Sequence, residues 1–208
     1  MKKFTSTLFA LVASVFLLVG CGENLLPQEG KHFSVLPSDL SKYKLDPVTE
    51  VFSLQCGHCR QMEHVIPELE KQTGQSFGKV HVTFNEGAKI GAMIYYTAVM
   101  QLDGVPDGEM MDELFAAVQL GDGASLQDRQ KAIEQAFISR DLYTPYELNE
   151  SHQSTLFEHM VVAEGVSVDG RINAVPSFII DGRYLINTSA HESVEDIART
   201  INYLIKNI

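Results

Sequence analysis

The chain has 208 residues, which is enough for one globular domain or for one domain that carries a large insertion. Its 16 Lys and Arg residues against 27 Asp and Glu residues give a formal net charge of −11. Proteins that bind nucleic acid neutralise phosphates with Lys and Arg, so this acidic balance argues against nucleic acid as a partner.

The first 20 residues have the composition of a signal peptide. Lys2 and Lys3 form a positive start, and a short apolar stretch from Leu8 to Leu18 follows. A membrane-spanning helix needs about 20 apolar residues, so export followed by cleavage is the better interpretation.

The end of this leader, Leu18-Val19-Gly20-Cys21, resembles the lipobox of bacterial lipoproteins. The resemblance implies that the thiol of Cys21 is acylated and that Cys21 becomes the new N-terminus, which would anchor the protein to the inner or the outer membrane. Gly22 in place of Asp favours the outer membrane. Residues 21–47 would then form a flexible polar tether and an N-terminal segment. An ordinary signal peptide in which Cys21 falls by chance is the alternative.

The region after the leader has the pattern of a strand, a helix and a second strand. Residues 32–46 are ambiguous and include a possible edge strand, whereas Val48 to Leu54 forms an apolar run typical of a buried strand. Helical spacing begins at Cys56 and ends at Thr73-Gly74, with a kink expected near Ile66 because Pro67 lacks a backbone donor. Residues 79–84 alternate as a strand does, so residues 48–87 predict a βαβ unit with a parallel strand pair.

Residues 88–160 show no strand pattern and predict an all-helical insertion. Ser125 with Asp128 three residues later is typical of a helix N-terminus. The helices expected from spacing and breakers are residues 88–102, 108–119, 126–137 and 145–160.

Residues 161–208 predict the second part of the α/β domain. Two apolar runs, Ser177 to Ile180 and Arg183 to Ile186, flank Asp181-Gly182, which is a strong signal for an antiparallel hairpin. The last helix is expected at residues 194–205, because its apolar residues recur on one face.

Cys56 and Cys59 form a C-x-x-C motif and are the two cysteines that remain once Cys21 is assigned to the lipid. A disulfide that closes a two-residue loop stabilises a fold little, so a pair of this kind in an exported protein favours redox chemistry. The alternative is half of a zinc site. A second C-x-x-C or a pair of histidines at ligand spacing is missing, so we expect no metal and no cofactor.

The position of the motif at the start of a helix assigns a role to each residue. Backbone N–H groups at the helix start stabilise a thiolate, so Cys56 is the expected exposed nucleophile. Cys59 lies one turn later, is expected to be more buried, and resolves the mixed disulfide. A positive His58 ring between them would favour the reduced form and make the disulfide a stronger oxidant.

The order of motifs resembles the DsbA branch of the thioredoxin superfamily, the bacterial periplasmic oxidants of protein thiols. The resemblance covers residues 48–208 and is carried by a strand that ends in Cys56-Gly57-His58-Cys59, a helix, the helical insertion, and Ala174-Val175-Pro176-Ser177-Phe178-Ile179 before the hairpin. It implies an α/β protein with a thioredoxin fold and an inserted all-helical subdomain.

The resemblance also implies where substrate binds. Val175-Pro176 would be a cis peptide bond in a loop that faces Cys56, and together with Gly57 it would contact the substrate backbone. An ordinary trans proline is the alternative, because only about 5–6% of X-Pro bonds in folded proteins are cis.

Glu50, Glu63 and Lys79 match positions where this family places a charged cluster beneath the disulfide. A carboxylate buried near Cys59 should have a raised pKa and would relay a proton when Cys59 becomes the nucleophile. Alternatively, Glu63 is a solvated helix residue and Glu50 is a polar group on an edge strand.

These features predict a periplasmic, lipid-anchored and monomeric thiol:disulfide oxidoreductase. Its implied partners are unfolded or partly folded exported proteins with reduced cysteines, and a DsbB-like quinone-linked membrane protein as the reoxidant. The best-known DsbA proteins have Pro where this chain has Gly57, whereas Cys-Gly-His-Cys is typical of disulfide isomerases, so the strength of the oxidant stays open. A reductase or isomerase is one alternative, and a non-catalytic holdase that binds peptides in the helical insertion is another.

Overall fold

The computed structural model describes residues 26–102 and 104–207. The predicted signal peptide and the lipidation site at Cys21 lie outside the described residues. Among the helices that are described, none is both long and apolar enough to cross a membrane.

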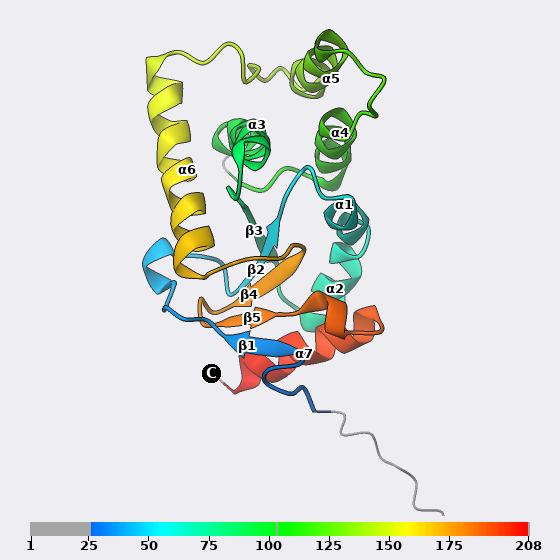
Figure 1. Cartoon of the computed structure of the whole chain (residues 1–208), viewed down its shortest axis with the longest axis vertical. Coiled ribbons are helices and arrows are strands. Elements are labelled where there is room, and N and C mark those ends of the chain that lie inside the picture. The colour runs from blue at the N-terminus through cyan, green and yellow to red at the C-terminus, as the bar shows by residue number, and fades with distance from the viewer. Residues whose placement is uncertain (1–25, 103, 208) are drawn as a thin grey trace, which may run out of the picture.

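A five-stranded sheet with the order β1-β5-β4-β2-β3 forms the centre of the molecule (Figure 1). β2 and β3 are parallel, as the βαβ pattern predicts, and the β4–β5 hairpin is antiparallel, as Asp181-Gly182 predicts. The possible edge strand in residues 32–46 is confirmed, because β1 pairs antiparallel with β5. The strands are β1 Phe33–Val35, β2 Val48–Phe52, β3 Phe77–His81, β4 Ser177–Ile180 and β5 Tyr184–Ile186.

Two groups of helices cover the sheet. α2 and α7 pack together against one face, and the helical insertion lies beyond the other face and the β3 edge (Figure 1). The bounds are α1 Gly57–Glu63, α2 Ile66–Thr73, α3 Glu86–Leu102, α4 Gly108–Val118, α5 Leu126–Ile138, α6 Glu150–Asp169 and α7 Val194–Lys206, with 3-10 turns η1 Ser41–Tyr43 and η2 Thr188–Ala190.

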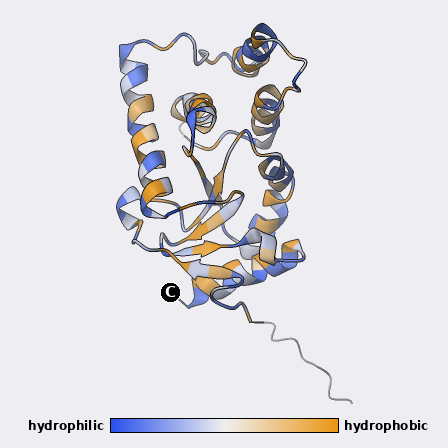
Figure 2. Ribbon diagram, viewed as in Figure 1, coloured by the Kyte–Doolittle hydropathy of each residue, from blue (hydrophilic) through white to orange (hydrophobic). Residues whose placement is uncertain are grey.

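Alternation along the strands divides the apolar core in two. In β4, Phe178 and Ile180 face α2 and α7, whereas Ile179 faces the insertion. Figure 2 shows the central strands as largely hydrophobic and α6 as banded, and several apolar residues of α6, among them Phe157 and Val168, are exposed. The predicted α/β architecture, with an all-helical insertion between β3 and β4, is therefore confirmed.

Several local predictions are also confirmed. The expected kink is a break between α1 and α2, with Pro67 in the first turn of α2, where its missing N–H costs no helical bond. α2 ends at Gly74, whose φ of 67° is in the left-handed region. Ser125 and Asp128 form a reciprocal capping box at the start of α5.

Three predicted boundaries were wrong. β3 spans Phe77–His81 rather than residues 79–84, because the pairing with β2 begins at Val48 and ends at Phe52. α6 starts at Glu150 rather than at residue 145, because the side chain of Asn149 caps it. The same helix continues to Asp169, so the expected boundary of the insertion after residue 160 falls inside it.

Gly165 explains why α6 continues through a residue that disfavours helices. The ring of Tyr43 packs directly over it, and a Cβ at position 165 would lie 2.3 Å from the Tyr43 hydroxyl oxygen. That hydroxyl donates to Asp169 Oδ2 at 2.7 Å, so the contact joins η1 to the end of α6. A close tertiary contact thus outweighs the low helix propensity of glycine.

We expect Gly165→Ala to destabilise the protein by about 1 to 2 kcal/mol, although alanine is the better helix former, because the rigid Tyr43 ring would have to move. Urea unfolding measures this change in free energy. The matched control is Gly108→Ala at the start of α4, where a Cβ meets nothing within 4 Å. Equal stability of the two variants would show that the Tyr43 contact is not tight.

Candidate active site

The C-x-x-C motif lies where β2 turns into α1. Cys56 is the N-cap residue of α1, and its sulfur accepts the backbone N–H of Cys59 at 3.4 Å. Both cysteines are free thiols; Cys59 is fully buried, whereas Cys56 is partly exposed. The predicted placement of an accessible sulfur at the helix start and a buried one a turn later is confirmed.

The loop before β4 faces this sulfur. The peptide bond between Val175 and Pro176 is cis, as predicted, and the Cys56 thiol lies 3.6 Å from the Val175 carbonyl oxygen. The Thr188 hydroxyl of η2 donates to the Pro176 carbonyl at 2.7 Å and so links the loop to η2. A substrate that reaches Cys56 would therefore meet this loop.

The two residues between the cysteines point to solvent. His58 and Gly57 are both exposed, and a Cβ at position 57 would meet nothing within 4 Å. Side chains other than hydrogen are therefore sterically acceptable at position 57.

Glu50, Lys79 and Glu63 meet beneath the active-site helix. The ammonium group of Lys79 pairs with Glu50 Oε2 and, at 2.6 Å, with Glu63 Oε1. Exposed fractions of 0% for Glu50, 4% for Lys79 and 7% for Glu63 exclude the alternative of solvated side chains. The second oxygen of Glu50 is buried and has no hydrogen-bond partner among the described residues.

Burial controls the protonation of these groups. It raises the pKa of Cys59 far above the ordinary thiol value, and the nearby Cys56 and Glu50 add to the rise. Burial also raises the pKa of Glu50 to about 7, although Lys79 opposes the shift. For Lys79, burial disfavours the charged form, but the two carboxylates outweigh it and raise the pKa. Cys59 is thus held as a thiol beside a carboxyl group that exchanges a proton near neutral pH.

The sequence did not single out two residues that bind the active-site turn. The imidazole of His81 accepts the backbone N–H of Leu54, and the side-chain amide of Gln119 donates to the carbonyls of Leu54 and Cys56. A usable signal existed for His81, since it lies in a strand that was expected to pair with the strand before Cys56. No local pattern marks Gln119, which follows α4 more than 60 residues later in the chain.

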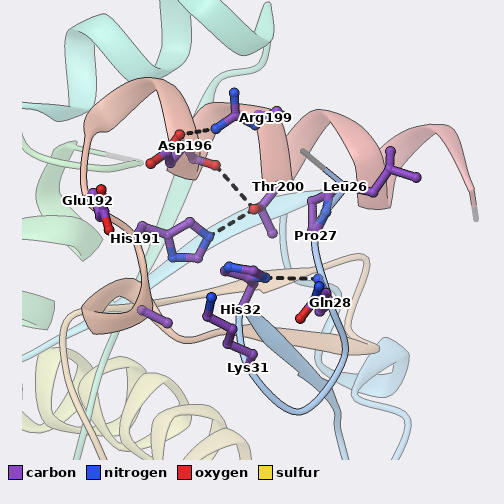
Figure 3. Close-up of a pocket in the computed structure, with 11 residues that line it drawn as sticks. Leu26, Pro27, Gln28, Lys31, His32, His191, Glu192, Asp196, Arg199 and Thr200 are labelled. Carbon is purple, nitrogen blue, oxygen red and sulfur yellow. Dashed lines mark hydrogen bonds and ion pairs between the residues drawn. The ribbon is translucent and has the colours of Figure 1, made fainter. Parts of the chain in front are cut away.

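A polar cavity of about 480 Å³ lies apart from the dithiol, between the N-terminal segment, the loop after η2, and α7 (Figure 3). His32 and His191 meet there with ring centroids 5.3 Å apart. His191 also bonds to the Asn187 carbonyl at 2.9 Å and to the Thr200 hydroxyl at 2.8 Å. These bonds hold the η2 segment against α7. They therefore also fix Thr188, whose hydroxyl donates to the Pro176 carbonyl. Among the described residues, no group of three or more His, Cys, Asp or Glu side chains is arranged to hold a metal ion.

Comparison with known proteins identifies the class. A family model described as Thioredoxin matches residues 45–202, and the chain belongs to this family. The thiol:disulfide interchange protein DsbA of Escherichia coli strain K12 is 24% identical over 194 residues, which cover 85% of this chain and 88% of that protein.

Solved structures of DsbA proteins share the fold. The DsbA of Pseudomonas aeruginosa has a TM-score of 0.63 at 18% identity and covers 87% of this chain and 94% of its own. Proteus mirabilis DsbA with a non-covalently bound peptide has a TM-score of 0.60 at 18% identity, over 87% of this chain and 99% of its own. The chain, with its cysteine pair at the start of α1, is a DsbA-like disulfide oxidoreductase.

The raised pKa of Glu50 predicts how stability depends on pH. The folded value of about 7 lies above the ordinary value of 4.5, so this contribution to stability is complete below pH 4.5 and is lost as pH rises through 7. The free energy of unfolding of Glu50→Gln relative to wild type should therefore rise between pH 4.5 and 8, by about 3 kcal/mol.

Urea unfolding at several pH values measures this difference. Lys79→Met removes the positive charge that opposes the shift in the Glu50 pKa, so its total loss of stability with rising pH should be larger than that of the wild type. A pH-independent difference between Glu50→Gln and wild type would contradict the assignment.

Proposed function

We propose that this protein is an exported, periplasmic and lipid-anchored oxidant that transfers a Cys56–Cys59 disulfide to cysteine pairs of unfolded or partly folded exported proteins. The observation that carries the proposal is the asymmetry of the pair: an accessible Cys56 sulfur that accepts a backbone N–H, and a fully buried Cys59. The peptide bound non-covalently to Proteus mirabilis DsbA supports a polypeptide as the substrate.

In the first step, a substrate thiolate attacks the Cys56 sulfur of the oxidised protein. The Cys56–Cys59 bond breaks, a mixed disulfide forms between the substrate and Cys56, and the electron pair leaves with Cys59. Because the pKa of Cys59 is raised, its sulfur is a poor leaving group unless it takes up a proton. We assign this proton transfer to Glu50, which is partly protonated near neutral pH and is kept in place by Lys79 and Glu63.

In the second step, a second substrate thiolate attacks the substrate sulfur of the mixed disulfide. A substrate disulfide forms, and Cys56 leaves as a thiolate that the N–H of Cys59 stabilises. The substrate has lost two electrons and the enzyme has gained them. A DsbB-like membrane protein would remove these electrons and restore the disulfide.

The substrate would lie between Cys56 and the loop at Val175-Pro176. Its backbone would run beside the cis peptide bond, and Gly57 leaves open space on the other side of the sulfur. The exposed His58 would act on the thiolate through its charge alone. Attachment of a lipid to Cys21 would keep this site near the membrane, and mass spectrometry of the mature protein tests it: an unmodified Cys21 would contradict the anchor.

Two measurements test the reaction. Equilibration with glutathione should give a reduction potential well above that of thioredoxin, about −270 mV, and a value as low as that would contradict an oxidant. Cys56→Ser should abolish the oxidative refolding of a reduced protein, because neither the Cys56–Cys59 disulfide nor the mixed disulfide with substrate can form without the Cys56 sulfur. Full activity of Cys56→Ser would support the non-catalytic holdase instead.

The dipeptide between the two cysteines, Gly57-His58, favours a second candidate function, that of an isomerase or a reductase. Cys-Gly-His-Cys is the motif typical of protein disulfide isomerases. We expect Gly57→Pro to raise the reduction potential by about 30 mV or more, since proline at the first helical position preorganises the helix start that stabilises reduced Cys56. The glutathione equilibrium measures the change. Gly57→Ala, which keeps the N–H, is the control and should shift the potential less; equal shifts would contradict the explanation.

A further inference from the structure

We propose that His81 is a positioning residue for the thiol–disulfide reaction, because its imidazole orients the turn that places the Cys56 sulfur. The imidazole touches neither sulfur and acts through the backbone of Leu54. The proposal depends on the thiol chemistry of Cys56 and holds whether the protein acts as an oxidant, a reductase or an isomerase.

The imidazole occupies a gap in the sheet. β2 and β3 are parallel, and Val82 N–H donates to the Phe52 carbonyl at 2.9 Å. In a parallel ladder of this register, the next bond would run from Leu54 N–H to the Val82 carbonyl. Instead, His81 Nε2 accepts the Leu54 N–H at 2.9 Å, and Nδ1 lies 2.7 Å from the Val82 carbonyl. One side chain thus bridges the two backbone groups where the strands separate.

These contacts determine the protonation of the ring. A backbone N–H only donates and a carbonyl only accepts, so Nε2 is unprotonated and Nδ1 carries the proton. Burial favours the same neutral form, and it lowers the pKa of His81 to about 4. The histidine therefore serves as a fixed donor and acceptor rather than as an acid or a base.

The bond to Leu54 determines the direction in which the chain enters α1. Leu54 and Gln55 are the central residues of a turn that closes with a bond of 2.9 Å from Cys56 N–H to the Ser53 carbonyl. His81 holds the N–H of Leu54, and Gln119 holds its carbonyl at 2.8 Å. With both sides bound, Cys56 has little freedom at the N-cap, and its sulfur stays within reach of the Cys59 N–H.

The residues packed around His81 fit the shape of an imidazole ring. Phe52 contacts the imidazole edge-on with centroids 5.0 Å apart, and the Tyr96 hydroxyl accepts the backbone N–H of His81. Gly91 of α3 provides the space, since a Cβ there would lie 2.9 Å from His81 Nε2. A Leu54 N–H that lost its acceptor here would find no water to replace it, so the turn would change instead.

Two substitutions of His81 distinguish the contribution of Nε2 from that of Nδ1. In His81→Gln the side-chain carbonyl reaches the position of Nε2 and still accepts from Leu54, whereas in His81→Asn the amide replaces Nδ1–H and leaves Leu54 without a partner. We measure the alkylation rate of Cys56 by iodoacetamide at pH 7, the equilibrium constant with glutathione, and the melting temperature. His81→Gln should stay within about twofold of wild type in both thiol measurements, whereas His81→Asn should lose about tenfold in each, because the Cys56 sulfur would no longer be held beside the Cys59 N–H.

A purely structural histidine would give a different result. Equal losses in both variants, or a lower melting temperature of His81→Asn with unchanged thiol measurements, would overturn the proposal. If neither variant folds, nitrogen NMR of the wild type still tests it, because the proposal requires a neutral His81 with the proton on Nδ1, and the other tautomer or a charged ring would overturn it. Failure of wild-type protein oxidation would contradict the proposed function and leave this result unaffected.

Discussion

The parallel pairing of β2 with β3 is the constraint on which the active site depends. Its register sets Glu50 opposite Lys79 and Phe52 opposite His81, so one strand pair supplies both the ion pair beneath the cysteines and the support of the turn above it. Glu63, the last residue of α1, then completes the cluster by pairing with Lys79. A slip of β3 by one residue would turn Lys79 and His81 to the face opposite Glu50 and Phe52.

The ion cluster is poorly explained by stability alone. Removing charges from water costs several kcal/mol per ion, and an ion pair recovers this only when every polar atom is satisfied. Here one oxygen of Glu50 is buried without a partner among the described residues. A need for Glu50 to change its protonation state would explain this arrangement. Lys79 keeps the carboxylate form accessible near neutral pH, whereas burial keeps the acid form accessible. A cluster tuned only for stability would have no need of this balance.

Local signals predicted much of the fold because the features they describe are local. The capping box at Ser125, the Asp181-Gly182 turn and Gly74 each specify a backbone conformation within a few residues. The extension of α6 through Gly165 could not be predicted in this way, because its cause is Tyr43, which is distant in the chain. The same holds for the active site: spacing identified the cysteines and the family resemblance implied the charged cluster, whereas the bonds of His81 and Gln119 to the turn require the register of β3 and the position of α4.

The helical insertion is bonded to the active site and does more than cover the sheet. Gln119 reaches the turn before Cys56, and Arg60 in α1 bonds to Asp112 in α4 at 2.9 Å. The insertion leaves the sheet after β3, whose His81 holds one side of the turn, and returns before the cis-proline loop, which faces the sulfur from the other side. Three segments that are distant in sequence therefore converge on the residues around Cys56. Such convergence restrains the sulfur more firmly than the short helix α1 would alone, because each segment is anchored in the packed core that lies between the sheet and the insertion.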